Sequence, residues 1–250
     1  LTDPDARAMA TSAKNSGMVG YNAQMAVDTE THLIVAHDVT NQVHDRDLLA
    51  PMAQAAKDAL QRDDLHALAD KGYFSGREIL LCHERGITTT VPRPETSGNR
   101  AKGMYVKADF AYEPEADVYL CPAGETLSYR YTTEEDGLQL RRYWTGECGN
   151  CAIRSRCTTG KERRITRWEH EHLIEEAQAR LKSASEPMKV RRSTVEHPFG
   201  TIKAWMGATH FLTRRLPNVK TEMALNVLAY NIKRMIALIG IQAMVTALRP

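Results

Sequence analysis

The sequence predicts a mixed α/β fold that is interrupted by a cysteine-rich insertion. In some short segments apolar side chains occur at every second position or without interruption, as in strands. These segments alternate with others in which apolar side chains recur at helical spacing. One short apolar run ends in an aspartate that is soon followed by glycine. Residues 93–185 then become polar, Arg-rich and Cys-bearing before helical spacing resumes. We therefore expect a core in two pieces, residues 1–92 and 186–250, with residues 93–185 inserted between them.

The first piece begins with a hairpin. Residues 21–28 alternate apolar and polar side chains, residues 29–32 are turn-like, and residues 33–40 are more apolar, which indicates two paired strands. A helix is expected next because apolar side chains recur at helical spacing, with Asp45 and Asp47 as candidate N-caps. Its apolar positions are Leu49, Met52, Ala56 and Leu60.

A second strand–helix–strand unit follows. His66 to Asp70 is a short apolar run, and Ser75 with Glu78 forms a capping-box pattern at the start of a helix that stops at Gly86. Residues 87–91 are rich in β-branched side chains and read as a strand. The order is thus strand, strand, helix, strand, helix, strand, with an acid at the C-terminal end of one strand, where open α/β sheets commonly place their sites.

Three further helices are expected in the last third of the chain. We expect a charged helix over residues 168–182, helical character over 191–205, and a final helix over 219–239 between Asn218 and Gly240. The apolar stripe of that final helix comprises Met223, Val227, Tyr230 and Ala237.

The composition favours a cytoplasmic protein. The sequence has no secretion signal, and no apolar run approaches the roughly 18 residues needed to span a bilayer, so we expect no membrane partner. The chain opens on Leu1, which suggests a fragment. Net charge is only +2, yet residues 141–167 hold eight Lys or Arg against two Glu, and residues 189–220 hold seven against one. A single run of this kind is usually a solvated face, but two of them favour a nucleic-acid partner.

Two segments carry candidate metal chemistry. Asp70 ends a strand beside Gly72 and could ligate a hard cation such as Mg²⁺, although a motif of this kind usually only terminates a strand. Arg192, Glu196 and Lys203 would share one helix face, which is either a salt-bridge stripe or a carboxylate ligand between two phosphate-binding cations. Pro198 interrupts the hydrogen-bond ladder there and could kink the helix.

These segments together resemble the bacterial insertion-sequence DDE transposases, which have an RNase H-like catalytic fold. The resemblance covers the segments 20–28, 69–75, 195–203 and 228–234. Arg192, Glu196 and Lys203 match the spacing of the family signature of Tyr, two residues, Arg, three residues, Glu, six residues and Lys. Lys189 stands where that signature has tyrosine.

The resemblance implies a site of two Asp and one Glu that binds Mg²⁺ or Mn²⁺. Asp70 corresponds to the second acid and Glu196 to the third, while Arg192 and Lys203 would bind phosphate. The first acid is expected upstream of the hairpin, and neither Asp28 nor Asp38 is assigned to it. We therefore expect this chain to be inactive alone. The complete enzyme would hydrolyse and join DNA at element ends as a homodimer near the bacterial nucleoid. The alternatives are a remnant that only binds DNA, and a nuclease on the same fold.

Four cysteines form a further candidate site. Cys121, Cys148, Cys151 and Cys157 lie in the insertion, and four thiolates can close a tetrahedral Zn²⁺ site. Their spacing is irregular, so free buried thiols remain the alternative reading. Cys82 stands alone on a predicted helix and is expected in the core.

Overall fold

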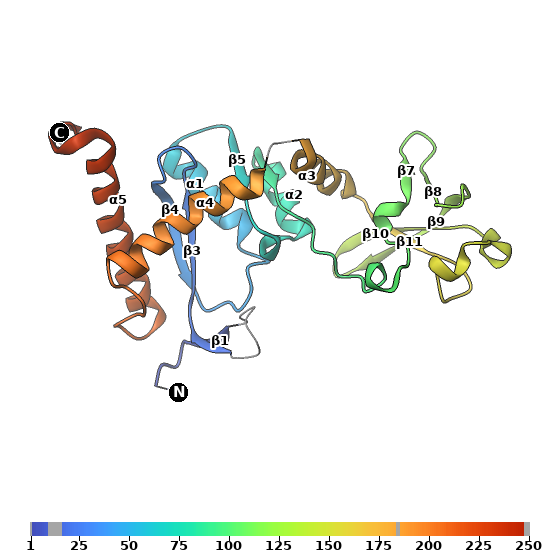
Figure 1. Cartoon of the computed structure of the whole chain (residues 1–250), viewed down its shortest axis with the longest axis horizontal. Coiled ribbons are helices and arrows are strands. Elements are labelled where there is room, and N and C mark those ends of the chain that lie inside the picture. The colour runs from blue at the N-terminus through green and yellow to red at the C-terminus, as the bar shows by residue number, and fades with distance from the viewer. Residues whose placement is uncertain (1, 10–16, 184–185, 248–250) are drawn as a thin grey trace. The chain divides into compact units, whose positions relative to one another are not determined.

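The computed structural model describes residues 2–9, 17–183 and 186–247, and it divides the chain into two compact units. Unit 1 combines Leu1–Arg93 with Leu173–Pro250, and unit 2 is Pro94–His172. The predicted boundary at residue 185 lies outside the described residues. Each unit is described below on its own (Figure 1).

The described residues of unit 1 form three two-stranded sheets. Strands β1 (Arg7–Met9) and β2 (Met18–Gly20) pair antiparallel. The predicted hairpin is confirmed as β3 (Asn22–Val27) and β4 (Ile34–Thr40), which also pair antiparallel. Strands β5 (Leu65–Leu68) and β6 (Ile87–Thr90) pair in parallel. Helices α1 (Leu49–Leu60) and α2 (Gly76–Glu84) fall between them, so the predicted order from the hairpin onward is correct.

The start of α1 differs from the prediction. Leu48 precedes the helix without a side-chain cap, so Asp45 and Asp47 do not cap it. Ser75 does precede α2, but its side chain makes no capping hydrogen bond either. Instead Glu78 of α2 accepts a hydrogen bond of 2.7 Å from the Ala50 amide of α1. This carboxylate serves an otherwise unpaired amide of the neighbouring helix, and its burial raises the pKa of Glu78.

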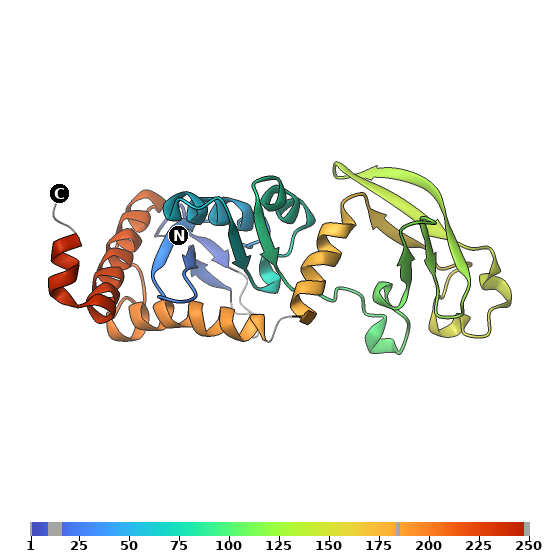
Figure 2. The same cartoon turned by 90° about the horizontal axis from the view of Figure 1, so that it is seen from above.

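Three further helices complete unit 1. Helix α3 (Glu171–Ser183) joins it from Leu173 onward, where Gln178 donates to the Val91 carbonyl and Arg180 to the Thr89 carbonyl. Helix α4 (Pro187–Gly200) continues through Pro198 and passes into the π-helix η6 (Thr201–Trp205). The sequence predicted a possible kink at Pro198. The observed irregularity is the π-helix that follows the proline. Figure 2 shows α1 and α4 on opposite sides of the strands of this unit.

The hairpin and the last helix, α5 (Leu216–Ala247), enclose one hydrophobic core. Met223, Val227 and Tyr230 of the predicted stripe are buried, but Ala237 is exposed. Tyr230 donates to the His32 carbonyl at 2.7 Å, and Asn231 bonds both the amide and the carbonyl of Ile34 at 3.0 and 2.8 Å. Arg234 adds a bond of 2.7 Å to the Thr31 carbonyl. Helix α5 is therefore fixed to the hairpin backbone by polar side chains as well as by its apolar stripe.

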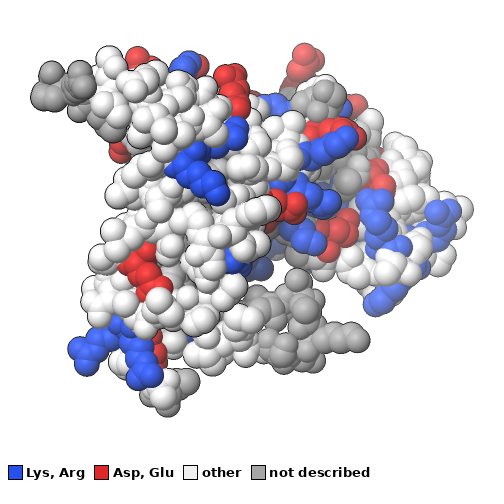
Figure 3. Space-filling model, turned by 60° about the vertical axis from the view of Figure 1, so that its left-hand side comes forward, with Lys and Arg blue, Asp and Glu red and all other residues white. Residues whose placement is uncertain are grey.

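Beyond this contact α5 is exposed. Gly240 breaks it with a φ of 80°, where the prediction ended the helix. By length and composition alone α5 could cross a membrane, a test that core helices of soluble proteins also pass. Figure 3 shows the face over α5 with few charged side chains. The larger exposed apolar residues of α5 are Leu225, Leu228, Ile232, Ile236, Leu238, Ile239, Ile241 and Val245.

Unit 2 is built on a five-stranded antiparallel sheet in the order β11-β10-β9-β8-β7. Tyr119 and Tyr143 fill its core with rings 5.2 Å apart and are almost completely buried. These two aromatics therefore pack across strands, whereas Tyr129 and Tyr131 are exposed. The strands are β7 (Ala111–Glu113), β8 (Val118–Leu120), β9 (Thr126–Glu135), β10 (Leu138–Trp144) and β11 (Ile165–Trp168).

Short 3₁₀ helices precede β7 and connect β10 to β11 in unit 2. They are η2 (Arg100–Lys102), η3 (Lys107–Asp109), η4 (Glu147–Asn150) and η5 (Arg154–Arg156). Arginine side chains lie over aromatic rings of the sheet: Arg141 is 4.8 Å from the Tyr129 ring and Arg164 is 4.8 Å from the Trp144 ring. Much of the basic cluster at residues 141–167 is therefore engaged in cation–π contacts within the unit.

Candidate active site

Asp70 lies just beyond the end of β5 and is fixed from two sides. Its Oδ1 accepts the Gly72 amide at 2.8 Å and so caps the 3₁₀ helix η1 (Lys71–Tyr73). Its Oδ2 accepts a hydrogen bond from Arg191 of α4 at 2.9 Å, and 43 % of the Asp70 side chain is exposed. Asp70 thus lies just beyond the C-terminal end of a strand, as predicted.

A second carboxylate lies beside Asp70. A Cβ atom placed on Gly72 would stand 3.0 Å from Asp70 Oδ1 and 3.4 Å from Asp45 Oδ2, so the two acids flank this glycine closely. Asp45 Oδ1 accepts hydrogen bonds from Asn22 at 2.6 Å and from Gln24 at 2.9 Å. Any larger residue at position 72 would displace Asp70.

Tyr73 and Arg191 complete this acidic cluster. The Tyr73 hydroxyl donates to Gln24 Oε1. Burial, and then the negative charges of Asp45 and Asp70, raise the pKa of Tyr73, while Arg191 opposes the shift. We call Asn22, Gln24, Asp45, Asp70, Tyr73 and Arg191 the acidic cluster. Two carboxylates and one guanidinium give it a net negative charge, which is suited to a cation.

Sequence reasoning missed the place of Asp45 in this cluster. The residue precedes a helix, where an aspartate is ordinarily an N-cap, and nothing in its local spacing points to Asp70. Only the hydrogen bonds from Asn22 and Gln24 at the start of β3 bring it to the end of β5. The one local signal was the density of polar side chains at both ends of the hairpin.

Glu196 occupies a different face of α4 from Arg191. They are five positions apart, and at about 100° per residue the two side chains point roughly 140° apart around the helix. The Glu196 side chain is 72 % exposed, and its carboxylate lies 3.9 Å from Arg192. Lys203 is also exposed and stands 5.8 Å from the Phe199 ring. The structure thus brings Arg191 to Asp70, while the predicted set of Arg192, Glu196 and Lys203 faces solvent.

Carboxylates are the donors that Mg²⁺ and Mn²⁺ prefer. Asp45 and Asp70 supply two of them at one point of the structure. Within the described residues, no three His, Cys, Asp or Glu side chains are arranged to hold an ion as they stand. The donor chemistry therefore fits a divalent cation, but a ligand set of Asp70 with Glu196 requires the α4 acid to approach the cluster.

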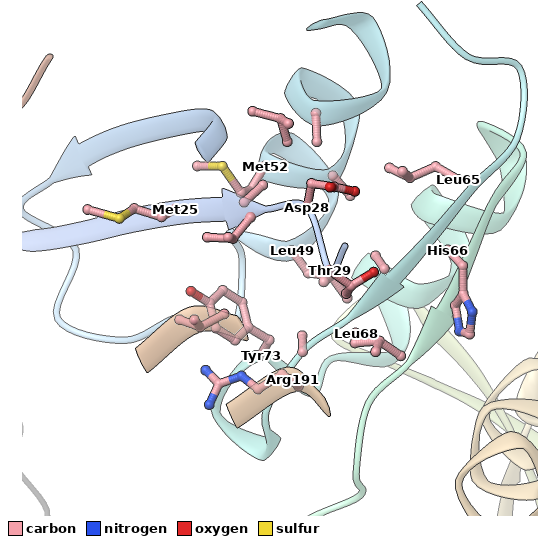
Figure 4. A pocket seen from close by; sticks show the side chains of 18 of the residues that line it. Met25, Asp28, Thr29, Leu49, Met52, Leu65, His66, Leu68, Tyr73 and Arg191 are labelled. Atoms are coloured by element: carbon pink, nitrogen blue, oxygen red, sulfur yellow. The ribbon is translucent and has the colours of Figure 1, made fainter. Parts of the chain in front are cut away.

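A cavity of about 220 Å³ adjoins the acidic cluster (Figure 4). Its walls are β3 and β5, with α1 and α4 on the other two sides, and most of its lining is apolar. Tyr73 and Arg191 lie at one end, and Asp28 and Leu65 also line it. Among the described residues, strands β3 and β5 each have one hydrogen-bonded neighbour, so each has a backbone edge that no described strand pairs with. We call this cavity the interstrand groove.

The four insertion cysteines lie together in unit 2. Cys121, Cys148, Cys151 and Cys157 all line one small cavity of about 20 Å³. Cys157 is buried, the other three are half-buried, and none forms a disulfide. Cys82 is separate and fully buried in unit 1, as predicted, and burial raises the pKa of its thiol to about 12.

Comparison with known proteins finds one family model that matches part of the chain. Residues 120–236 match the model of the transposase DDE domain. That range contains α4 with Arg191, Arg192 and Glu196, and also all four insertion cysteines. No curated protein and no solved structure matches the chain significantly. The domain implies an RNase H-like fold and a DNA substrate, and the match over residues 120–236 supports a DDE transposase.

Proposed function

We propose that this transposase cuts and joins DNA at insertion-sequence ends with Mg²⁺ or Mn²⁺ held by Asp70 and Glu196. The observation that carries the proposal is the Arg191–Asp70 ion pair of 2.9 Å, which joins two motifs 121 positions apart in the sequence. This pair holds α4 against the end of β5. Glu196 lies on the same helix, within two turns of Arg191. A cation bound at Asp70 would compete with Arg191 and draw in the exposed Glu196 carboxylate.

Each residue then has a defined chemical task. The carboxylates would hold the divalent cations, which would supply charge stabilisation for an in-line phosphodiester substitution. Arg192 and Lys203 are exposed on α4, where a planar guanidinium can grip a phosphate bidentately and an ammonium can add a point charge. Asp45 would position Asp70 through the shared space over Gly72, and Asn22 and Gln24 hold Asp45 in place.

The interstrand groove suggests where a third carboxylate enters. Gln24, near the start of β3, reaches Tyr73 beyond the end of β5, so the two strands run in opposite directions along the groove. An added extended segment would therefore pair in parallel with one strand and antiparallel with the other. If it runs parallel to β5, its C-terminal end reaches Asp70. An aspartate there would complete the set of three acids.

The remaining partners follow from the family rather than from a contact in the structure. We propose that the DNA comprises the terminal repeats of the element and a target duplex, bound by two copies of the transposase in the bacterial cytoplasm near the nucleoid. The basic clusters at residues 141–167 and 189–220 would contact phosphates. Binding should therefore weaken steeply as salt is raised.

The test uses the complete transposase in an element-excision assay in cells, together with DNA binding by the purified protein. Asp70→Asn and Glu196→Gln should each reduce excision by at least 100-fold and leave DNA affinity within about threefold, because the amides keep the shape and lose the charge. Asp64→Asn and Glu84→Gln are matched controls on exposed sites of unit 1 and should excise normally. Normal excision by Glu196→Gln would remove Glu196 as a ligand.

A DNA-binding remnant is the second candidate, and one observation favours it. Asp70 is already neutralised by Arg191, and Glu196 stands apart on an exposed face. Such a protein would bind DNA with the same salt dependence and show no nicking of supercoiled plasmid with Mg²⁺ or Mn²⁺, even when complete. Cleavage that Asp70→Asn abolishes would exclude it.

A further inference from the structure

We infer that Cys121, Cys148, Cys151 and Cys157 together bind one Zn²⁺ ion that stabilises the end of unit 2. The inference is independent of the reaction at the acidic cluster. Cys121 follows β8, Cys148 and Cys151 lie in and just after η4, and Cys157 follows η5. All four thiols nevertheless line the same cavity.

The size and lining of that cavity suit a single ion. Its volume of about 20 Å³ is close to that of one water-sized sphere. Four sulfur donors are the complete ligand set of a structural tetrahedral zinc site. Thiolates select zinc or an iron–sulfur centre over Mg²⁺ and Ca²⁺, and a cavity for one ion favours zinc. Among the described residues the thiols are not yet at ligating distances, so the ion would draw them together.

Basic side chains surround the thiols. Arg154 and Arg163 line the same cavity, and the Arg163 Nε is buried without a hydrogen-bond partner among the described atoms. Four thiolates around Zn²⁺ carry a net charge of −2, which these guanidinium groups would offset. An N–H donor directed at a zinc-bound sulfur is the outer-shell contact that such sites use.

The surrounding structure explains why a metal would matter here. The segment from Thr145 to Arg164 contains no strand and only the short helices η4 and η5. The core of unit 2 consists of Phe110, Tyr119, Leu127, Tyr143, Cys157 and Ile165, so only Cys157 of this segment belongs to it. Because the segment makes few apolar contacts, its folding would depend on a metal cross-link. The free energy of metal binding would then contribute directly to the free energy of folding.

The first experiment measures the metal content of the full-length chain purified without added metal and then loaded with Zn²⁺. We expect one zinc per chain in the wild type and in Cys82→Ala, and loss of zinc in Cys148→Ser and Cys151→Ser. Substitution by Co²⁺ should give the intense d–d absorption of a tetrahedral thiolate site. Iron in place of zinc, a disulfide between Cys148 and Cys151, or unchanged zinc in both Ser variants would overturn the inference.

The second measurement needs no variant and covers the case in which a substitution prevents folding. Alkylation of the wild-type chain should modify the four insertion thiols rapidly after chelation and at least tenfold more slowly with Zn²⁺ bound. Cys82 should react slowly in both states because it is fully buried. Equal alkylation rates with and without zinc would show that these thiols do not bind it.

Discussion

Asp117 shows how one side chain can organise the sheet of unit 2. Its Oδ1 accepts hydrogen bonds from Tyr112 and Tyr143, both at 2.7 Å, and its Oδ2 pairs with Arg141. Burial opposes ionisation, but the bonds from Tyr143 and Tyr112 and the charge of Arg141 outweigh it and lower the pKa of Asp117 below 3.8. The stabilising form of this residue is therefore the carboxylate.

This gives a prediction for acid stability. A lowered folded pKa adds stability that is complete above the unfolded pKa of 3.8 and is lost as pH falls through the folded value. Asp117→Asn should lower the free energy of unfolding at pH 7 by about 1–2 kcal/mol and flatten its decline between about pH 5 and pH 2. Urea unfolding followed by tryptophan fluorescence at several pH values measures both effects.

Asp136→Asn provides the matched control for that experiment. Asp117 and Asp136 both have left-handed backbones, with φ of 52° and 51°, and asparagine tolerates this conformation. Asp136 is exposed in the turn between β9 and β10. Equal effects of the two substitutions would show that the tyrosine and arginine contacts of Asp117 contribute nothing measurable.

At the scale of elements, the contact of α5 with the hairpin gives a structural role to residues 228–234. The sequence had identified this segment only through its resemblance to the transposases. In residues 228–234, Tyr230, Asn231 and Arg234 each bond backbone groups of residues 31–34. Asn231 is central because its amide donates to and accepts from Ile34, much as a neighbouring strand would. The polar side chains of this helix therefore determine where the hairpin lies against it.

Asn231→Leu should consequently destabilise unit 1. The change leaves the amide and carbonyl of Ile34 without these partners, at a cost of about 2 kcal/mol for two hydrogen bonds. Asn226→Leu on the same helix is the control, because Asn226 bonds only the Glu222 carbonyl of its own helix. Chemical denaturation measures the stability, and faster hydrogen exchange of the Ile34 amide should accompany its loss. Similar losses for both variants would contradict the proposed contact.

At the scale of the whole molecule, each unit contains a hydrophobic core of its own among the described residues. One lies between the hairpin and α5 in unit 1, and the other lies on the antiparallel sheet of unit 2. A separate core is the physical requirement for a unit that can unfold on its own. The chain should therefore not behave as one two-state system.

Core substitutions should report this separation. Tyr143→Ala removes a fully buried ring from unit 2 and should destabilise that unit by about 3–5 kcal/mol. Met223→Ala, which removes a buried side chain from unit 1, should cost about 2–5 kcal/mol there. Native-state hydrogen exchange of the full chain, resolved by peptide, should show each effect confined to its own unit. Faster exchange in both units from either change would indicate one cooperative fold.

The amino-acid sequence by itself determined the elements from the hairpin to β6 and the resemblance to the DDE transposases. Local periodicity fixes which face of a strand or helix is apolar, so the hairpin, α1, β5, α2 and β6 could be predicted in order. Motif spacing selected Asp70 and Glu196 as candidates. Local patterns also fixed the start of α2 at Ser75, but they assigned the wrong partner to Glu78.

Only the tertiary structure decided which distant groups meet. Asp45 joins Asp70 over Gly72, Arg191 rather than Glu196 reaches that carboxylate, and four thiols converge on one cavity. None of these contacts has a local periodic signal, because each depends on how separate elements pack. The physical reason is that helical and strand periods act over a few residues, whereas a site is made by side chains whose separation along the chain is unrelated to their distance in space.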